Sequence, residues 1–271
     1  MIENKNFVAY WEKEYFNCDF FTTGYTDLDS FLMNIKGGNI ITIGGRPAMG
    51  KTNFLLPIID HLAEENKRVA VFCLEYSKEQ FLKRLLMYKA DIYPYLNKGL
   101  SSDDFKKLAE KMEEYSKSEI YLCDRVMLTV EELEEKVKEL KPEVVFIDYV
   151  QLLQMPKAPN LTEATNLAIH ELKRIATENN VIMFVTSQLS RAVESRVDKH
   201  PVLSDLRNGS LLEELSDVVL MIYRDEYYNV ESIAPHSAEI IVMKNKYGPT
   251  GTVNLTFKNG KFSNWTVEGA L

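Results

Sequence analysis

The sequence is poor in cysteine. Its three cysteines, Cys18, Cys73 and Cys123, stand far apart and form no Cys-x-x-Cys pair. This spacing argues against a disulfide framework. Cys73 and Cys123 lie in or beside apolar runs, so we expect reduced thiols in the core of a cytosolic protein.

A long hydrophobic run is also lacking. No apolar stretch approaches the roughly 18 residues that a membrane span needs. The opening stretch MIENKNFVAYWEKEYF is polar and acidic, unlike a signal peptide. These features predict a soluble cytoplasmic protein that binds no membrane. Repeats, low-complexity segments and Pro/Gly/Ser-rich linkers are absent from the sequence too, which favours one domain.

The sequence has fewer basic than acidic residues. With 32 Lys and Arg against 40 Asp and Glu, the formal net charge is −8. A chain with this balance does not coat nucleic acid by bulk charge. Any contact with DNA is therefore expected to come from a local basic loop.

What the sequence does have is an alternation of short apolar runs with longer helical patterns. Nearly continuous apolar runs lie at residues 39–43, 68–74, 119–124, 143–148 and 181–187. Such runs are typical of parallel strands covered by helices on both faces. Residues 160–179 have apolar side chains at helical spacing, with Asn160 and Glu163 placed as an N-terminal cap, and they predict a crossover helix.

The pattern changes after residue 217, where apolar runs alternate with turn signals such as YGPTG and KNG. We expect these runs to form antiparallel strands that extend the same sheet. The predicted fold class is α/β, with a mostly parallel central sheet flanked by helices and C-terminal antiparallel strands. Residues 1–20 are predicted as a helical arm or linker, and residues 21–271 as one domain.

One motif carries specific chemistry. The stretch GRPAMGKT at residues 45–52 matches G-x-x-x-x-G-K-[ST] and lies between a predicted strand and a predicted helix. Backbone N–H groups of such a loop surround phosphate oxygens, Lys51 neutralises the phosphates, and the Thr52 hydroxyl binds Mg²⁺. The predicted nucleotide-binding residues of the loop are Gly45, Ala48, Met49, Gly50, Lys51, Thr52 and Asn53.

Three polar residues end neighbouring predicted strands. Asp148 ends VVFID and is predicted to hold Mg²⁺ beside the phosphate loop; a cap on the next turn is the alternative. Glu75 ends VAVFCLE and suits a general base that activates water, although it could instead be a solvated helix-start carboxylate. Gln188 is placed to sense the γ-phosphate, or it is an ordinary polar strand end.

Two cationic segments could serve a polymer or a neighbouring subunit. Residues 191–210 are rich in cations and poor in aromatics, which suits a grip on a phosphate backbone rather than base stacking; a solvated loop is the alternative. Lys244 and Lys246 point to the same face of a late strand. They could reach a neighbour's ATP as fingers, or protect a sheet edge.

Taken in order and spacing, these motifs closely resemble the ATPase domain of DnaB-type replicative helicases. The stretches that carry the resemblance are TTGYTDLDSFL, GRPAMGKT, VFCLEYS, FIDYVQLL, TSQLSRAVESRVDKHPVLSDLR, YRDEYY and KNKYGPTGTVNLTF. The resemblance implies a RecA-like fold and an ATP-dependent helicase motor that moves 5′ to 3′ along single-stranded DNA as a homo-hexamer. A RecA-like ATPase that does not unwind DNA, of recombinase or regulatory type, is the alternative.

Carried over by position, the resemblance assigns Lys51 and Thr52 to phosphate and Mg²⁺, Asp148 to Mg²⁺, Glu75 to the catalytic base and Gln188 to the γ-phosphate sensor. It assigns Lys244 and Lys246 to the pair inserted from an adjacent subunit, and Arg224 to a position near the nucleotide. The predicted DNA-binding residues are Arg191, Arg196, Lys199, Arg207, Asn208 and Gly209.

The sequence departs from the family at two places. Lys246 stands where the family usually has an arginine, which has a planar bidentate fork that lysine lacks. RNGSLLEE replaces the usual RESGSIEQ in the DNA loop. The family's N-terminal helical domain, through which primase and a helicase loader would bind, has no counterpart in these 271 residues.

Overall fold

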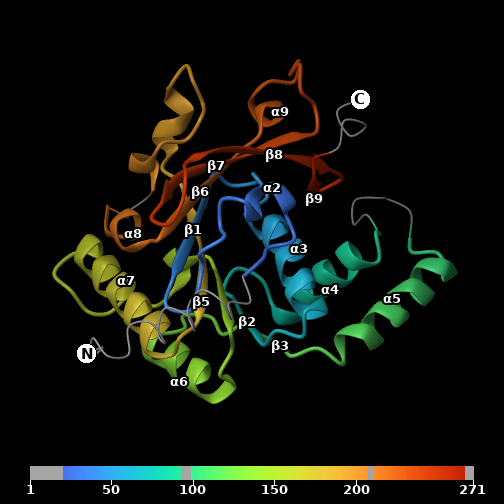
Figure 1. Cartoon of the computed structure of the whole chain (residues 1–271), viewed down its shortest axis with the longest axis horizontal. Coiled ribbons are helices and arrows are strands. Elements are labelled where there is room, and N and C mark those ends of the chain that lie inside the picture. Colours follow the sequence, from blue (N-terminus) through green and yellow to red (C-terminus); the bar gives the residue numbers. More distant parts are fainter. Residues whose placement is uncertain (1–20, 93–98, 207–209, 266–271) are drawn as a thin grey trace, which may run out of the picture.

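The computed structural model describes residues 21–92, 99–206 and 210–265. These residues form one nine-stranded sheet in the order β3-β2-β4-β5-β1-β6-β7-β8-β9 (Figure 1). The predicted arm at residues 1–20 lies outside the described residues, as does Cys18. Cys73 is buried and Cys123 is partly buried, and both are free thiols.

The predicted parallel strands are confirmed. They are β1 (Ile40–Gly45), β2 (Val69–Cys73), β3 (Ile120–Cys123), β4 (Val144–Asp148) and β5 (Ile182–Gln188). Neighbouring members of this set all pair in parallel. Within the described residues no helix is long and apolar enough to span a bilayer.

The C-terminal strands are β6 (Val218–Tyr223), β7 (Ser237–Asn245), β8 (Gly251–Lys258) and β9 (Lys261–Asn264). The prediction that all four are antiparallel is wrong for β6, which pairs in parallel with β1 and only on its other side meets β7 in antiparallel register. Since β6 has a parallel neighbour on one side and is buried along its whole length, its unbroken apolar run matches those of the preceding strands. The strands β7, β8 and β9 pair antiparallel as predicted.

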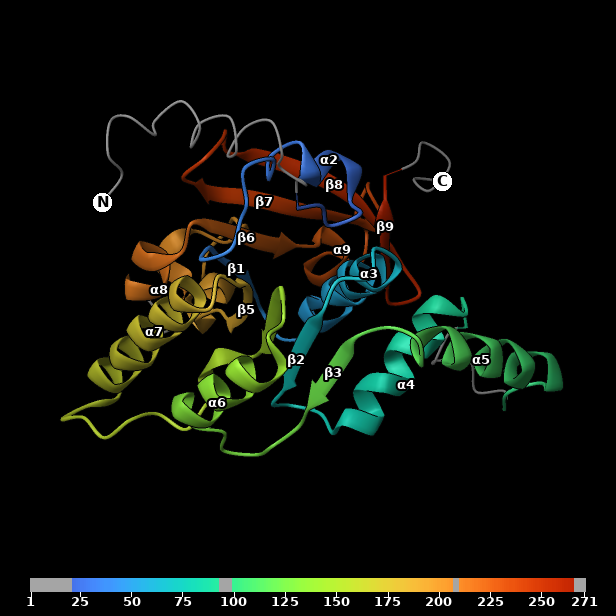
Figure 2. The ribbon, with the colours of Figure 1, turned by 60° about the horizontal axis from the view of Figure 1, so that its bottom comes forward.

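Helices cover both faces of the sheet, as Figures 1 and 2 show. On one face, α3 (Lys51–Glu64) and α4 (Lys78–Lys89) pack against Ile41 and Val71; on the other, α6 (Val130–Leu140) and α7 (Leu161–Glu178) pack against Ile40 and Ala70. Alternate residues of one strand thus enter two separate cores, because side chains alternate across a strand. This double burial explains the continuous apolar runs.

Polar side chains cap the N-termini of α7 and α4. The Asn160 side chain accepts a hydrogen bond from the Glu163 N–H at 2.9 Å and begins α7, and a reciprocal Ser77–Gln80 capping box begins α4. The remaining helices are α2 (Thr26–Asp29), α5 (Ser102–Tyr115), α8 (Ser210–Leu215) and α9 (Asp225–Tyr228), with 3-10 turns η2 (Val150–Leu152), η3 (Arg191–Ser195) and η4 (Leu203–Asp205).

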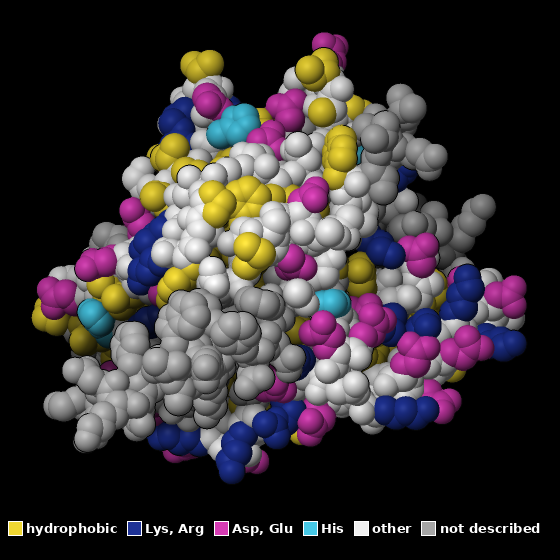
Figure 3. Space-filling model, viewed as in Figure 1, with side chains coloured by type: hydrophobic (Ala, Val, Ile, Leu, Met, Phe, Trp, Pro, Cys, Tyr) yellow, Lys and Arg dark blue, Asp and Glu magenta, His cyan; other side chains and the backbone are white. Residues whose placement is uncertain are grey.

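The helix α5 has no buried residue. Acidic and basic side chains are interspersed over it and the adjoining surface (Figure 3). Because both signs alternate there, this helix presents no single-sign field to a polymer.

Candidate active site

The phosphate loop leads from β1 into α3. Gly50 caps α3 with a positive φ of 96°, and Ala48 also has a positive φ of 61°. A Cβ atom at residue 50 would lie 2.9 Å from the Phe262 ring and 3.2 Å from the Phe257 ring. Glycine is therefore required at residue 50 both by backbone conformation and by the close packing of the C-terminal strands.

Lys51 lies across its own loop. Its Nζ donates to the carbonyl oxygens of Gly45 and Arg46 at 2.9 and 3.3 Å. Burial lowers the pKa of Lys51, while the carboxylates of Asp148 and Glu75 act in the opposite direction. The phosphate groups of a bound nucleotide would therefore replace these two carbonyl oxygens as partners of the Lys51 ammonium.

Thr52 and Asp148 are hydrogen-bonded to each other beside the phosphate loop. The Thr52 hydroxyl donates to Asp148 Oδ2 at 2.6 Å, and Thr186 Oγ1 donates to the other carboxylate oxygen at 2.5 Å. Asp148 is only 2% exposed. A hydroxyl and a carboxylate held this close fit the hard-oxygen preference of Mg²⁺, which retains several waters in such sites.

Glu75 lies two residues beyond the end of β2 rather than within it. Partial desolvation at the cavity wall raises its pKa, and the nearby Asp148 carboxylate raises it further, while Lys51 and Arg84 act in the opposite direction. A carboxylate with a raised pKa is a stronger base, so the position and the pKa of Glu75 both suit proton abstraction.

These side chains surround one cavity of about 370 Å³. Its walls include eight residues predicted from the sequence to serve the nucleotide or the reaction: Ala48, Gly50, Lys51, Thr52, Asn53, Glu75, Gln188 and Arg224. Met49 is buried, and Asp148 lies behind Thr52, to which it is hydrogen-bonded. The structure therefore brings together residues that are up to 176 positions apart.

Two polar residues at or beside this cavity were not predicted from the sequence, Arg84 and Gln151. Arg84 lines it, with its guanidinium 4.1 Å from the centre of the Tyr76 ring. Gln151 braces the end of β5: its Nε2 donates to Ser187 Oγ at 2.8 Å, and its Oε1 accepts from the Gln188 N–H at 3.3 Å. Gln151 lies within the stretch FIDYVQLL, but nothing in the spacing of that stretch gave it a role, and Arg84 belongs to no motif.

Arg224 reaches the phosphate loop from the end of β6. Its guanidinium lies 3.7 Å from the centre of the Phe257 ring and donates to the Ala48 carbonyl at 3.3 Å. Glu226 accepts from it at 2.5 Å. Arg224 therefore lies beside the loop that would hold the phosphates.

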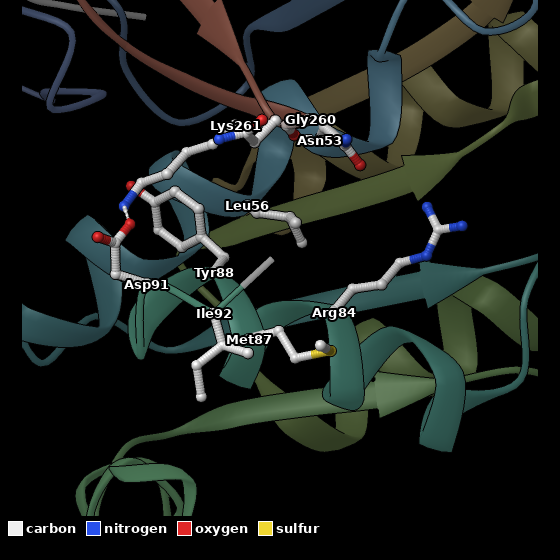
Figure 4. Close-up of a pocket in the computed structure, with 10 residues that line it drawn as sticks. Asn53, Leu56, Arg84, Met87, Tyr88, Asp91, Ile92, Gly260 and Lys261 are labelled. Carbon is white, nitrogen blue, oxygen red and sulfur yellow. Dashed lines mark hydrogen bonds and ion pairs between the residues drawn. The ribbon is translucent and has the colours of Figure 1, made fainter. Parts of the chain in front are cut away.

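A smaller cavity of about 140 Å³ adjoins the first and shares Asn53, Arg84 and Gly260 with it. Figure 4 shows Leu56 and Met87 at its apolar wall, between α3 and α4. Asn53 Nδ2 donates to the Gly260 carbonyl at 2.6 Å and joins α3 to the β8–β9 turn. An apolar pocket thus continues directly from the phosphate loop.

The family model described as "DnaB-like helicase C terminal domain" matches residues 21–265. The chain belongs to this family. Among DnaB-like relatives, it is 37% identical to the replicative DNA helicase DnaC of Bacillus subtilis over 244 residues, 87% of this chain and 54% of that protein. The identity to the replicative helicase DnaB of Geobacillus stearothermophilus is also 37%, over 245 residues that cover 87% of this chain.

The chain spans about half the length of these DnaB-like relatives, 54% in both cases. Among solved structures, one described as an ATPase domain superimposes with a TM-score of 0.89 at 33% identity, covering 97% of this chain and 98% of that one. A DnaB-like replicative helicase studied for its interactions with primase also gives 0.89 and 33%, covering 98% and 69%. The family membership favours the helicase reading over the non-unwinding alternative.

The two lysines of the DnaB-like KNKYGPTG motif do not reach the cavity of their own chain. Lys244 donates to the Glu213 and Glu214 carbonyls at the end of α8, and Lys246 to Asp217 Oδ1 at 3.1 Å. Asp217 holds the start of β1 through the Ile40 N–H, whereas the phosphate loop follows the end of β1. At about 3.3 Å per residue, the six-residue strand separates the two ends by roughly 17 Å.

The segment predicted to bind DNA makes several polar contacts within itself. Arg196 forms a bidentate ion pair with Asp205 at 2.9 and 2.8 Å, and Lys199 donates to the carbonyls of Glu194 and Arg196. Arg191 is exposed. In this DnaB-like chain the guanidinium of Arg196 is thus already engaged within the loop. The predicted ligands Arg207, Asn208 and Gly209 lie outside the described residues.

Proposed function

We propose that this chain is the ATP-hydrolysing motor domain of a replicative DNA helicase, which translocates 5′ to 3′ on single-stranded DNA and unwinds duplex. The observation that carries the proposal is the single cavity that unites Lys51, Thr52, Glu75 and Gln188, with Asp148 hydrogen-bonded to Thr52. This is the set of groups that phosphoryl transfer from ATP to water requires.

Each residue has a distinct role in the proposed reaction. The loop N–H groups and Lys51 bind the β- and γ-phosphates, and Glu75 accepts the proton of the attacking water. Gln188 hydrogen-bonds the γ-phosphate. Thr52 and Asp148 would hold Mg²⁺, which neutralises charge developing on the phosphates. Arg84 and Arg224 line the same cavity and add positive charge to it.

The proposed assembly is a homo-hexamer around single-stranded DNA in the cytoplasm. Lys244 and Lys246 would then complete a neighbour's cavity, because their own lies at the opposite end of β1. DNA would contact the cationic loop through Arg191, Lys199 and Arg207, with Arg196 supporting the loop from within. Primase and a helicase loader would bind through a further N-terminal domain, for which the greater length of the relatives leaves enough residues.

A titration of protein concentration tests the proposal. We expect ATP turnover per subunit to rise steeply with protein concentration and to increase further with single-stranded DNA, since active sites are completed between subunits. Turnover that stays constant per subunit and ignores DNA would contradict the motor. Strand separation of a forked duplex with a 5′ tail, and not of one with a 3′ tail, distinguishes a helicase from a non-unwinding ATPase.

The smaller cavity beside the phosphate loop would hold the nucleobase. Met87→Trp is expected to fill this cavity and to weaken ATP binding by roughly tenfold or more. The base would no longer bury its apolar faces, which contributes over about 1.4 kcal/mol to the free energy of ATP binding. Binding of inorganic tripolyphosphate, measured by calorimetry, should remain unchanged. Met33→Trp, at an exposed methionine, is the control. Equal weakening of both ligands by Met87→Trp would contradict the assignment.

A further inference from the structure

The second residue of the phosphate-loop motif turns away from the nucleotide cavity. Arg46 is 8% exposed, and all three of its guanidinium nitrogens are used. Nε and Nη2 donate to Glu194 Oε1 at 2.9 and 2.6 Å, and Nη1 donates to the Leu189 carbonyl at 2.7 Å. Phosphate binding alone does not explain why this loop holds a buried arginine against residues 143 and 148 positions away.

The partners of Arg46 belong to one segment, residues 189–206, which we name the sensor segment because it follows Gln188. Its two ends lie side by side: Leu189 and Leu206 form an antiparallel bridge, and the Ser190 N–H donates to the Asp205 carbonyl at 2.7 Å. The Arg196–Asp205 ion pair closes it from within. The two ends of the segment are therefore held together by main-chain and side-chain contacts.

Arg46 also contacts the phosphate loop from its main chain. The Arg46 carbonyl accepts from the Met49 N–H at 3.3 Å and from Lys51 Nζ at 3.3 Å. A nucleotide that draws Lys51 toward its phosphates removes the second of these contacts. The same residue thus holds the phosphate-binding lysine by its backbone and the sensor segment by its side chain.

We propose that the Arg46–Glu194 ion pair couples the phosphate loop to the sensor segment, so that nucleotide occupancy and DNA binding change each other's affinity. Arg46 and Glu194 act as positioning residues: neither supplies the base, and Glu194 does not line the nucleotide cavity. This inference rests on the proposed function, because it takes single-stranded DNA as the ligand of the sensor segment. The ion pair is a direct physical link between the two sites, of the kind that can carry coupling between them.

The test compares two variants that remove one negative charge each from the sensor segment. Glu194→Gln breaks the pair with Arg46, whereas Asp198→Asn, the control, changes an exposed carboxylate that hydrogen-bonds His200. Both change the formal charge of the segment by the same amount, so a general electrostatic effect on DNA binding would appear in both. Oligothymidylate is the DNA probe. The readouts are ATP turnover with and without it, and its Kd with and without a non-hydrolysable ATP analogue.

For Glu194→Gln we expect basal turnover and nucleotide-free DNA affinity to match those of Asp198→Asn. The nucleotide-dependent change in Kd should fall by at least about fivefold, since coupling factors for binding usually lie between about 5 and 150. Stimulation of turnover by DNA should fall as well. If Glu194→Gln retains the coupling of the wild type, or if Asp198→Asn loses as much coupling as Glu194→Gln, the inference is wrong and the proposed function is unaffected. Absence of any DNA stimulation in the wild-type chain would overturn the proposed function and the inference together.

Discussion

Glu75→Gln is expected to lower ATP turnover by about 10²- to 10⁴-fold while nucleotide binding persists, since general-base catalysis contributes about this factor. The amide keeps the shape of the side chain but cannot accept the proton of the attacking water. Phosphate release under saturating ATP measures turnover, and binding of a fluorescent ATP analogue measures affinity. Glu79→Gln, which changes an exposed carboxylate on α4, should leave both unchanged.

The pH dependence gives a second measure of the same residue. Because the pKa of Glu75 is raised, the base becomes protonated at a higher pH than an ordinary glutamate. Wild-type turnover should therefore fall as pH is lowered through this raised pKa, and the Gln variant should lose that acid limb. Near-normal turnover in Glu75→Gln would refute the assignment of the base.

Lys246→Ala is expected to lower turnover of the assembled protein by about 10³-fold or more, the effect of removing a finger that stabilises charge in a neighbour's site. Each chain should still bind ATP, since its own Lys246 lies at the far end of β1 from its cavity. A steady-state assay at saturating protein concentration measures the loss.

Mixing chains of two inactive variants tests whether Lys246 acts in the site of a neighbouring subunit. Glu75→Gln chains retain Lys246, and Lys246→Ala chains retain Glu75, so a mixed assembly contains complete sites and should recover turnover that neither variant has alone. Lys173→Ala is the control, because Lys173 also pairs with Asp217, at 2.6 Å, without belonging to the predicted finger pair. No recovery on mixing would show that Lys246 does not act between subunits.

The position of the candidate site was predictable because each part of it is contiguous in sequence. The phosphate loop lies in eight consecutive residues, 45–52, and Asp148 and Gln188 end apolar runs that could be recognised as strands. Since the carboxyl ends of parallel strands meet at one edge of a sheet, their convergence followed. Glu75 lies at the same edge, two residues beyond the end of β2.

The contacts between distant segments were not predictable. The direction of β6 is set by the path of the chain before it, and its apolar run reads the same in either direction. The sequence shows the charge of Arg196 but not its ion pair with Asp205. The Arg46–Glu194 pair joins residues 148 positions apart, which no local spacing reveals.

In the proposed assembly, Lys244 and Lys246, which lie beside the start of β6, would give each subunit a donor end, and the cavity at the other end of β1 would give it a receiving end. Subunits joined in this way form a heterologous, head-to-tail contact, which yields either an open row or a closed circle. An open row leaves one receiving cavity without lysines and one lysine pair without a cavity. Closure removes both vacancies at once, so each closed ring has one more complete catalytic site than an open row of the same number of subunits.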